Sequence, residues 1–174
     1  PTVVIQQTEM EEQYRAGKYI PMSLDEAVEW TMFAYIFFKQ IGTTIIRMGL
    51  HASESLLLEG NIVAGPFHSA FGEMVESRIY WYILKEAVEK HKWESKSITI
   101  RANQKIFSKI SGNRGENRKK LKSRLGVEYT FLPNDQLEED ISVEFEGRSY
   151  FLKKEAFCQN LVHGSLRDVG EQVR

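Results

Sequence analysis

The sequence predicts an α/β protein in which a βαβ unit is followed by a smaller α+β module. Two observations carry this prediction. An apolar run at 3–5 and a strand-like segment at 43–50 enclose a long stretch with helical patterning, which is the order of a right-handed βαβ unit. Further along, the strand patterns 97–101 and 127–131 enclose two short helix patterns, which is a βααβ order.

The first half reads as a strand, a short helix, a long helix and a second strand. The apolar run 3–5 is typical of a parallel strand covered on both faces. A short helix is expected over 9–16. A capping box formed by Ser23 and Glu26 begins the longer helix, because each residue can satisfy a free backbone or side-chain group of the other. The expected strand 43–50 then closes the βαβ unit.

A possible strand at 62–64 and a helix over about 69–92 complete the first expected domain, 1–94. The second expected domain, 95–174, holds the βααβ order. Two more strand patterns meet at Gly147 and predict a C-terminal hairpin.

Composition is that of an ordinary globular protein, with 42% hydrophobic and 27% charged residues. The net charge of −1 means that any attraction to nucleic acid must come from a local patch. The single cysteine, Cys158, cannot form an internal disulfide or hold a metal alone, so we expect a small buried thiol and a reducing, cytoplasmic compartment. No apolar run approaches the roughly 18 residues of a membrane span, so no membrane partner is expected.

Polar side chains on one side of the expected strand 43–50 suggest a site. Alternation places four residues on that side: Ile45, Arg47, Gly49 and His51. Because α/β active sites gather at the C-terminal ends of strands, Arg47 and His51, with His68 at the next helix start, are candidates for an active-site wall. From these residues alone, the favoured alternative is an edge strand with a solvated Arg47 and locally hydrogen-bonded histidines.

An ordered series of segments resembles the last third of the radical SAM barrel in bacterial proteins related to the Elongator catalytic subunit. The similarity covers roughly residues 1–90 and extends more weakly beyond them. The segments are Pro1-Thr-Val-Val-Ile-Gln-Gln-Thr8, Glu12-x-Tyr14-x-x-Gly17-x-Tyr19-x-Pro21-x-Ser23-Leu-x-Glu-Ala-Val28, Ile45-Ile-Arg-Met-Gly-Leu50 and Gly65-Pro-Phe-His-Ser-Ala-Phe-Gly-Glu-Met-Val-Glu-Ser77.

The resemblance implies that the βαβ unit is the remnant of a partial TIM-like barrel. It also implies an N-terminal radical SAM part, whose three cysteines hold an iron–sulfur cluster that cleaves S-adenosylmethionine. This chain lacks that motif, so we expect no cofactor, metal ligand or catalytic residue in it, and no activity from it alone. The abrupt apolar start is expected to be a cut, and exposed edges of the strands 2–6 and 43–50 predict homodimer formation.

The sequence Gly112-Asn-Arg-Gly115 lies between the two short helix patterns, which is the order of a KH-like RNA-binding module. Glycines allow close approach to a nucleic-acid backbone, and the next helix presents free N–H groups and cations to phosphate. The candidate RNA-binding residues are Gly112, Asn113, Arg114, Gly115, Arg118, Lys119, Lys120 and Lys122.

Two other interpretations compete with RNA binding. The glycine sequence is also a good turn, and the basic helix can be a solvated surface, so the chain can be a structural or protein-interaction module of a radical SAM protein that acts on a small molecule. A self-contained hydrolase is disfavoured, because the sequence has no G-x-S-x-G, H-E-x-x-H or Walker pattern. The resemblance to Elongator-related proteins favours transfer RNA as a partner.

Overall fold

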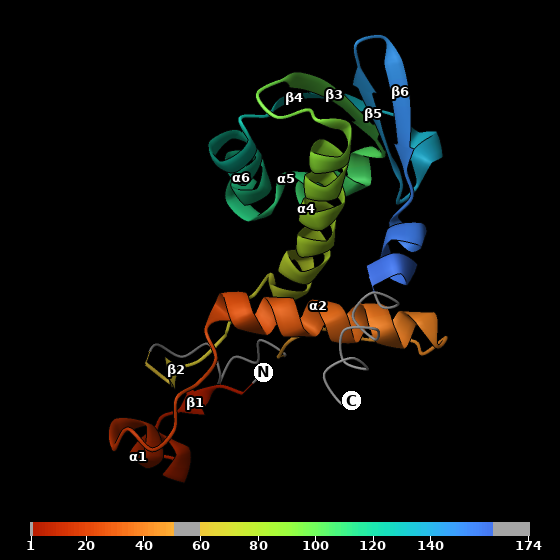
Figure 1. The fold of residues 1–174 in the computed structure, drawn as a ribbon. Coiled ribbons are helices and arrows are strands. Elements are labelled where there is room, and N and C mark those ends of the chain that lie inside the picture. The colour runs from red at the N-terminus through yellow and green to blue at the C-terminus, as the bar shows by residue number, and fades with distance from the viewer. Residues whose placement is uncertain (1, 51–59, 162–174) are drawn as a thin grey trace, which may run out of the picture. The chain divides into compact units, whose positions relative to one another are not determined.

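A computed structural model describes residues 2–50 and 60–161 of the chain (Figure 1). It divides into two units, Pro1–Val75 and Glu76–Arg174. Helix α4, Phe71–His91, supplies residues to both units, so the division falls inside this helix and ahead of the boundary that the sequence predicts. Within the described residues, every helix is too short or too polar to cross a lipid bilayer.

The first unit contains a two-stranded sheet and two helices before α4. The capping box is confirmed: the Ser23 hydroxyl accepts from the Glu26 amide at 3.2 Å, and Glu26 Oε2 accepts from the Ser23 amide at 2.8 Å. Hydrogen bonds from the Ser23 hydroxyl and then its amide lower the pKa of the Glu26 carboxyl. The elements are β1 (Val4–Ile5), α1 (Glu9–Arg15), α2 (Leu24–Gln40) and β2 (Ile62–Ala64).

The prediction of a strand at 43–50 is wrong, and with it the parallel βαβ pairing. The segment has no strand assignment, and β1 pairs instead with β2 in the antiparallel direction, with Val4 opposite Ala64. Ile46 is 95% exposed and Arg47 is exposed. The physical reason is that a strand needs a neighbour to take its backbone hydrogen bonds, and no described strand pairs with this segment.

Gly49 allows the same segment to pack closely against the first turn of α4. Its φ is +84°, and a Cβ atom at this position would lie 2.8 Å from Cδ1 of Phe71. A larger residue would therefore meet both a strained backbone and the buried Phe71 ring. The alternating pattern that suggested a strand thus belongs to an extended segment held by one close contact.

The second unit is a four-stranded sheet in the order β4-β3-β5-β6. Strands β3 and β4 are parallel, whereas β5 is antiparallel to both β3 and β6. The βααβ order and the C-terminal hairpin that the sequence predicts are therefore both present. The elements are β3 (Ser97–Ala102), α5 (Phe107–Ser111), α6 (Glu116–Leu125), β4 (Glu128–Pro133), β5 (Ile141–Phe145) and β6 (Arg148–Leu152). Short 3-10 turns lie at Gln104–Ile106, Asn113–Gly115 and Asp135–Leu137.

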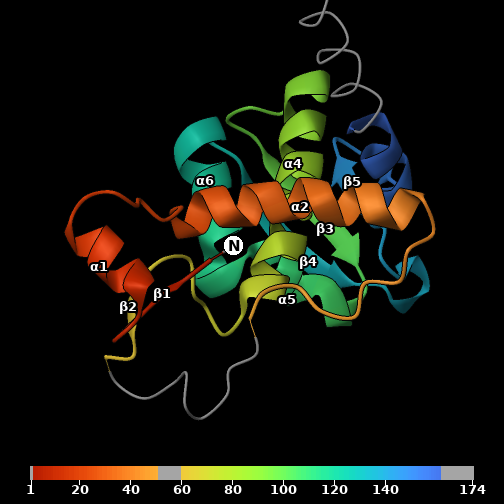
Figure 2. The same cartoon turned by 90° about the horizontal axis from the view of Figure 1, so that it is seen from below.

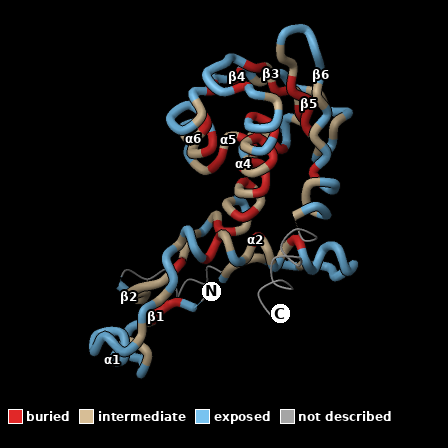
Figure 3. The backbone as a smooth tube through the Cα atoms, viewed as in Figure 1, coloured by how far each residue is buried: buried red, intermediate tan, exposed pale blue. Residues whose placement is uncertain are grey.

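One face of this sheet supplies the core of the second unit. Ile98, Ile100 and Ala102 of β3 are buried, while the residues between them are half-buried, so the predicted alternation is confirmed. Figure 3 shows buried positions along β3, β5 and the part of α4 that belongs to this unit. Because α5 and α6 are short, their buried residues Ile110 and Leu121 are what hold them to this core.

A buried lysine anchors the last described helix, residues 154–161, to the second unit. Lys154 is buried, and its Nζ lies 2.8 Å from Glu139 Oε1 and 3.8 Å from Glu76 Oε2. Its backbone amide also donates to Asp140 Oδ1 at 2.9 Å. The charge is therefore paired where it leaves water, as a buried ammonium requires.

Candidate functional site

The glycine loop, Gly112–Gly115, connects α5 to α6 and has an unusual backbone. Positive φ angles occur at Gly112 (81°), Arg114 (51°) and Gly115 (72°). A Cβ atom on Gly112 would lie 2.7 Å from the amide nitrogen of Asn117, whereas one on Gly115 would meet no atom within 4 Å. The first glycine is therefore required by packing, and the second only by its backbone conformation.

Asn117 fixes the glycine loop from inside. Its side chain is buried, and Nδ2 lies 2.9 Å from the carbonyl oxygen of Ser77, 3.0 Å from Ser77 Oγ and 3.2 Å from the carbonyl oxygen of Ile110. One amide thus joins α4, the end of α5 and the start of α6. Asn117 was not among the residues predicted from the sequence, although its spacing of four from Leu121 places it on the buried side of α6.

Several of the predicted RNA-binding cations already have partners within the unit. Lys120 Nζ lies 2.6 Å from Glu116 Oε1, and Lys122 Nζ lies 2.6 Å from Glu128 Oε1. The Lys122 ammonium lowers the pKa of the Glu128 carboxyl through this hydrogen bond. The local positive charge of α6 is therefore smaller than its sequence suggests.

Arg118 contacts an aromatic residue instead of a carboxylate, and Arg114 and Lys119 contact neither among the described residues. The Arg118 guanidinium carbon lies 5.2 Å from the ring centroid of Tyr129, and its Nη2 donates to the Tyr129 carbonyl at 3.5 Å. Arg114 and Lys119 are exposed and form no ion pair with another described residue. Asn113 is half-buried in the loop. Among the candidate RNA-binding cations, Arg114 and Lys119 therefore have neither a carboxylate partner nor an aromatic contact within the described residues.

The first turn of α6 places the positive end of the helix dipole beside these cations. Its N-cap residue, Gly115, has no side chain that could cap the helix, and the Glu116 amide donates to the carbonyl oxygen of Asn113. The Glu116 carboxylate would oppose an anion here, but the pairing with Lys120 offsets part of its charge.

The candidate active-site wall is only partly described. His68 Nδ1 accepts the amide of Ala70 at 3.0 Å, in the turn just before α4, and the His68 carbonyl accepts the Phe71 amide at 3.1 Å. Arg47 lies in the exposed segment 43–50, and no hydrogen bond joins it to His68. His51 lies outside the described residues. Local hydrogen bonding, the alternative weighed for the histidines, is thus what His68 shows.

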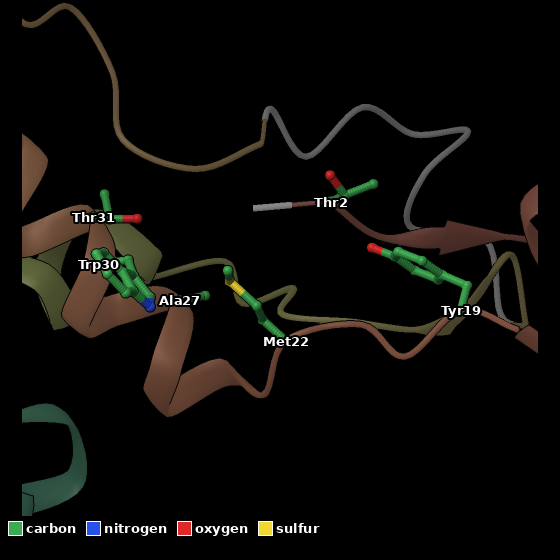
Figure 4. A pocket seen from close by; sticks show the side chains of 6 residues that line it. All are labelled: Thr2, Tyr19, Met22, Ala27, Trp30 and Thr31. Atoms are coloured by element: carbon green, nitrogen blue, oxygen red, sulfur yellow. The ribbon is translucent and has the colours of Figure 1, made fainter. Parts of the chain in front are cut away.

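An open pocket of about 270 Å³ lies in the first unit, between the N-terminal segment and α2 (Figure 4). No sequence pattern indicated this pocket. Its walls are apolar and aromatic apart from hydroxyl groups, and none of its lining residues is charged, so it suits a small uncharged group rather than a phosphate. The lining residues are Thr2, Tyr19, Met22, Ala27, Trp30 and Thr31.

The described ranges, 2–50 and 60–161, contain no group of three or more histidine, cysteine, aspartate or glutamate side chains placed to hold a metal ion. Cys158, the single cysteine of the chain, is half-buried.

Comparison with known proteins gives one result. Residues 1–80 match the family model described as the Radical_SAM C-terminal domain. The match supports a radical SAM C-terminal domain over the first unit and the beginning of α4. No curated protein and no solved structure matches the chain.

Proposed function

We propose that this chain is the C-terminal part of a radical SAM protein related to the Elongator catalytic subunit, and that its second unit helps to hold a transfer RNA substrate. The match of residues 1–80 supports the radical SAM part of the first statement, and the relation to the Elongator catalytic subunit rests on the resemblance of the sequence segments. The observation that carries the second is the glycine loop between α5 and α6, beside which Arg114 and Lys119 are exposed. In this proposal the intact protein is the enzyme, and this chain binds and positions the transfer RNA substrate.

The cofactors of the proposed enzyme are assigned outside the described residues. A radical SAM enzyme uses an iron–sulfur cluster to cleave S-adenosylmethionine reductively. Iron–sulfur clusters are held by several cysteine thiolates, whereas this chain has a single cysteine, Cys158, so its donor set does not fit such a cluster. The proposal therefore assigns the cluster and S-adenosylmethionine to the radical SAM part of the intact protein.

The arrangement of the second unit supports the RNA proposal physically. Strands β3 and β4 are parallel neighbours, so α5, the glycine loop and α6 form the connection between them. The loop has little side-chain bulk at Gly115, where nothing lies within 4 Å of a Cβ position, so a sugar–phosphate backbone can approach it. The first turn of α6, whose N-cap residue Gly115 has no capping side chain, supplies the positive end of the helix dipole for phosphate.

The proposal predicts which cations matter. Changing Arg114 and Lys119 together to alanine is expected to weaken binding of a transfer RNA transcript about tenfold at 0.1 M salt, and to reduce the slope of log K against log [salt] by roughly 1.5 to 2. Fluorescence anisotropy across a salt series measures both. The matched control is the double variant Lys120→Ala and Lys122→Ala, which removes the same charge. It is expected to weaken RNA binding less, because both lysines are already paired with glutamates.

The outcomes separate the alternatives. Equal losses in the two double variants would mean that the basic face binds as a diffuse surface rather than through the loop. Unchanged affinity in both would remove the RNA role from the second unit.

A second candidate function, a protein-interaction module, has its own observation. Helix α2 exposes an apolar face formed by Trp30 (66% exposed), Phe37 (44%) and Ile41 (60%). Their spacing of seven and four residues places them on one side of the helix and its C-terminal end. The neighbouring segment 43–50 leaves its backbone without a strand partner. Both features suit docking against the preceding radical SAM part of the protein.

This candidate predicts that Trp30→Ser weakens association of this chain with the separately produced preceding part by at least tenfold, because a large exposed aromatic is a typical interface anchor. Titration calorimetry measures the affinity. Tyr14→Ser on α1 is the matched control, since it also removes an exposed aromatic of the first unit. A homodimer of this chain that Trp30→Ser dissociates, measured by light scattering, would instead assign the α2 face to self-association.

A further inference from the structure

Two half-buried phenylalanines form an aromatic shelf between α5 and β4. The rings of Phe107 and Phe131 have centroids 4.5 Å apart and are tilted by 50°. Phe131 lies on β4, which is the outermost strand of the sheet, so no described strand covers the outer side of the shelf. This ring contact joins α5 to β4, which overlap in the view of Figure 2. The aromatic shelf, Phe107 and Phe131, is thus part core and part accessible surface.

The aromatic shelf continues into the polar groups beside the glycine loop. Tyr129 precedes Phe131 by two residues on β4 and therefore faces the same side of the sheet. Its hydroxyl lies 3.0 Å from Ser111 Oγ, and Ser111 is the residue immediately before Gly112. The Arg118 guanidinium covers the Tyr129 ring at 5.2 Å. Tyr129 itself is buried beneath the exposed Arg118, so Arg118 is the residue that lies at the surface between the glycine loop and the aromatic shelf.

We propose that the aromatic shelf stacks the unpaired bases of single-stranded RNA whose phosphates lie along the glycine loop. This inference rests on the proposed RNA-holding function and names the form of RNA that the site takes. Aromatic faces stack on any base, and the adjacent cations complement the sugar–phosphate chain. In duplex RNA the bases stack on one another and only the shallow minor groove and the phosphates are offered, so a duplex makes no use of the shelf.

The test compares two forms of one RNA. A labelled single-stranded 12-mer of mixed sequence, alone or annealed to its complement, is titrated with the 174-residue chain and followed by anisotropy. The single strand is expected to bind at least tenfold more tightly than the duplex. Phe107→Leu and Phe131→Leu, which keep the apolar volume but remove the ring, are each expected to weaken single-strand binding about fivefold or more and to leave duplex binding unchanged.

Two further variants serve as controls for the aromatic shelf. Phe151→Leu removes a 69% exposed ring from β6, the opposite edge of the sheet, and is expected to bind like the unchanged chain. Phe107→Tyr retains the aromatic face and is expected to retain the affinity even if a leucine variant folds poorly. Thermal unfolding of each variant reports folding.

Failure of the shelf is distinguishable from failure of the proposed function. Equal binding of single strand and duplex, or unchanged affinity in both leucine variants, overturns the shelf while binding that depends on Arg114 and Lys119 persists. Loss of affinity in Phe107→Tyr equal to that in Phe107→Leu also overturns it. RNA binding that is absent, or indifferent to Arg114 and Lys119, overturns the RNA-holding function itself.

Discussion

Replacing Asn117 by alanine is expected to destabilise the second unit by about 3 kcal/mol. The substitution removes a buried amide and leaves the carbonyl groups of Ser77 and Ile110 without the donor that they share. Each buried acceptor that loses its partner costs on the order of 1–3 kcal/mol, since water cannot readily replace the lost donor. Denaturant unfolding measures the loss. A Trp30→Phe background restricts the fluorescence signal to Trp81 and Trp93, which are both buried in this unit.

Two companion variants identify the cause. Asn117→Asp keeps the shape but replaces the donating amide by a carboxylate, which repels the same carbonyl oxygens, so we expect a loss at least as large. Asn113→Ala changes the same residue type within the loop, where no side-chain hydrogen bond to a described residue is lost, and is expected to cost less than about 0.5 kcal/mol. Similar losses for Asn113→Ala and Asn117→Ala would contradict the assigned role of Asn117.

Gly112→Ala is expected to destabilise the same unit by about 3 kcal/mol, whereas Gly115→Ala is expected to cost only about 1 kcal/mol. Both positions have positive φ, 81° and 72°, so both variants carry backbone strain. Only at Gly112 does the added methyl group also meet backbone, 2.7 Å from the Asn117 amide nitrogen. Gly112 also has a ψ of 161°, in a region that essentially only glycine adopts, whereas Gly115 is left-handed helical with a ψ of 26°. The difference between the two unfolding free energies therefore measures the close approach of the loop to α6 together with the greater backbone strain at Gly112.

Unfolding in the Trp30→Phe background again gives the free energies. Equal losses in the two variants would mean that the loop relaxes around the methyl group and that packing does not require Gly112. A loss near zero for Gly115→Ala would mean that the backbone at this position can change conformation freely.

The elements that the sequence predicted correctly are those set by neighbours along the chain. The capping box of Ser23 and Glu26, the long helix at 69–92 and the hairpin at Gly147 each depend on residues a few positions apart. The βααβ order of the second unit follows from the same short-range patterns. Caps and periodicity act within one or two turns, so the sequence displays them directly.

The elements that the sequence predicted wrongly depend on a partner that lies far along the chain. The segment 43–50 has the composition of a strand, but a strand forms only where another backbone takes its hydrogen bonds, and β1 pairs with β2 instead. Nothing in the local pattern of β1 specifies that its neighbour lies about sixty residues away and runs in the antiparallel direction, Val4 opposite Ala64.

The candidate site was likewise only partly predictable from the sequence. The sequence by itself determined that a glycine loop followed by a basic helix stands between two strands. Only the tertiary structure decided that Lys120 and Lys122 are paired while Arg114 and Lys119 are exposed, that Asn117 holds the loop to Ser77, and that Phe107 meets Phe131. The physical reason is that charge pairing, burial and ring contact depend on distances in space, and the fold brings together residues such as Ser77 and Asn117 that lie far apart along the chain.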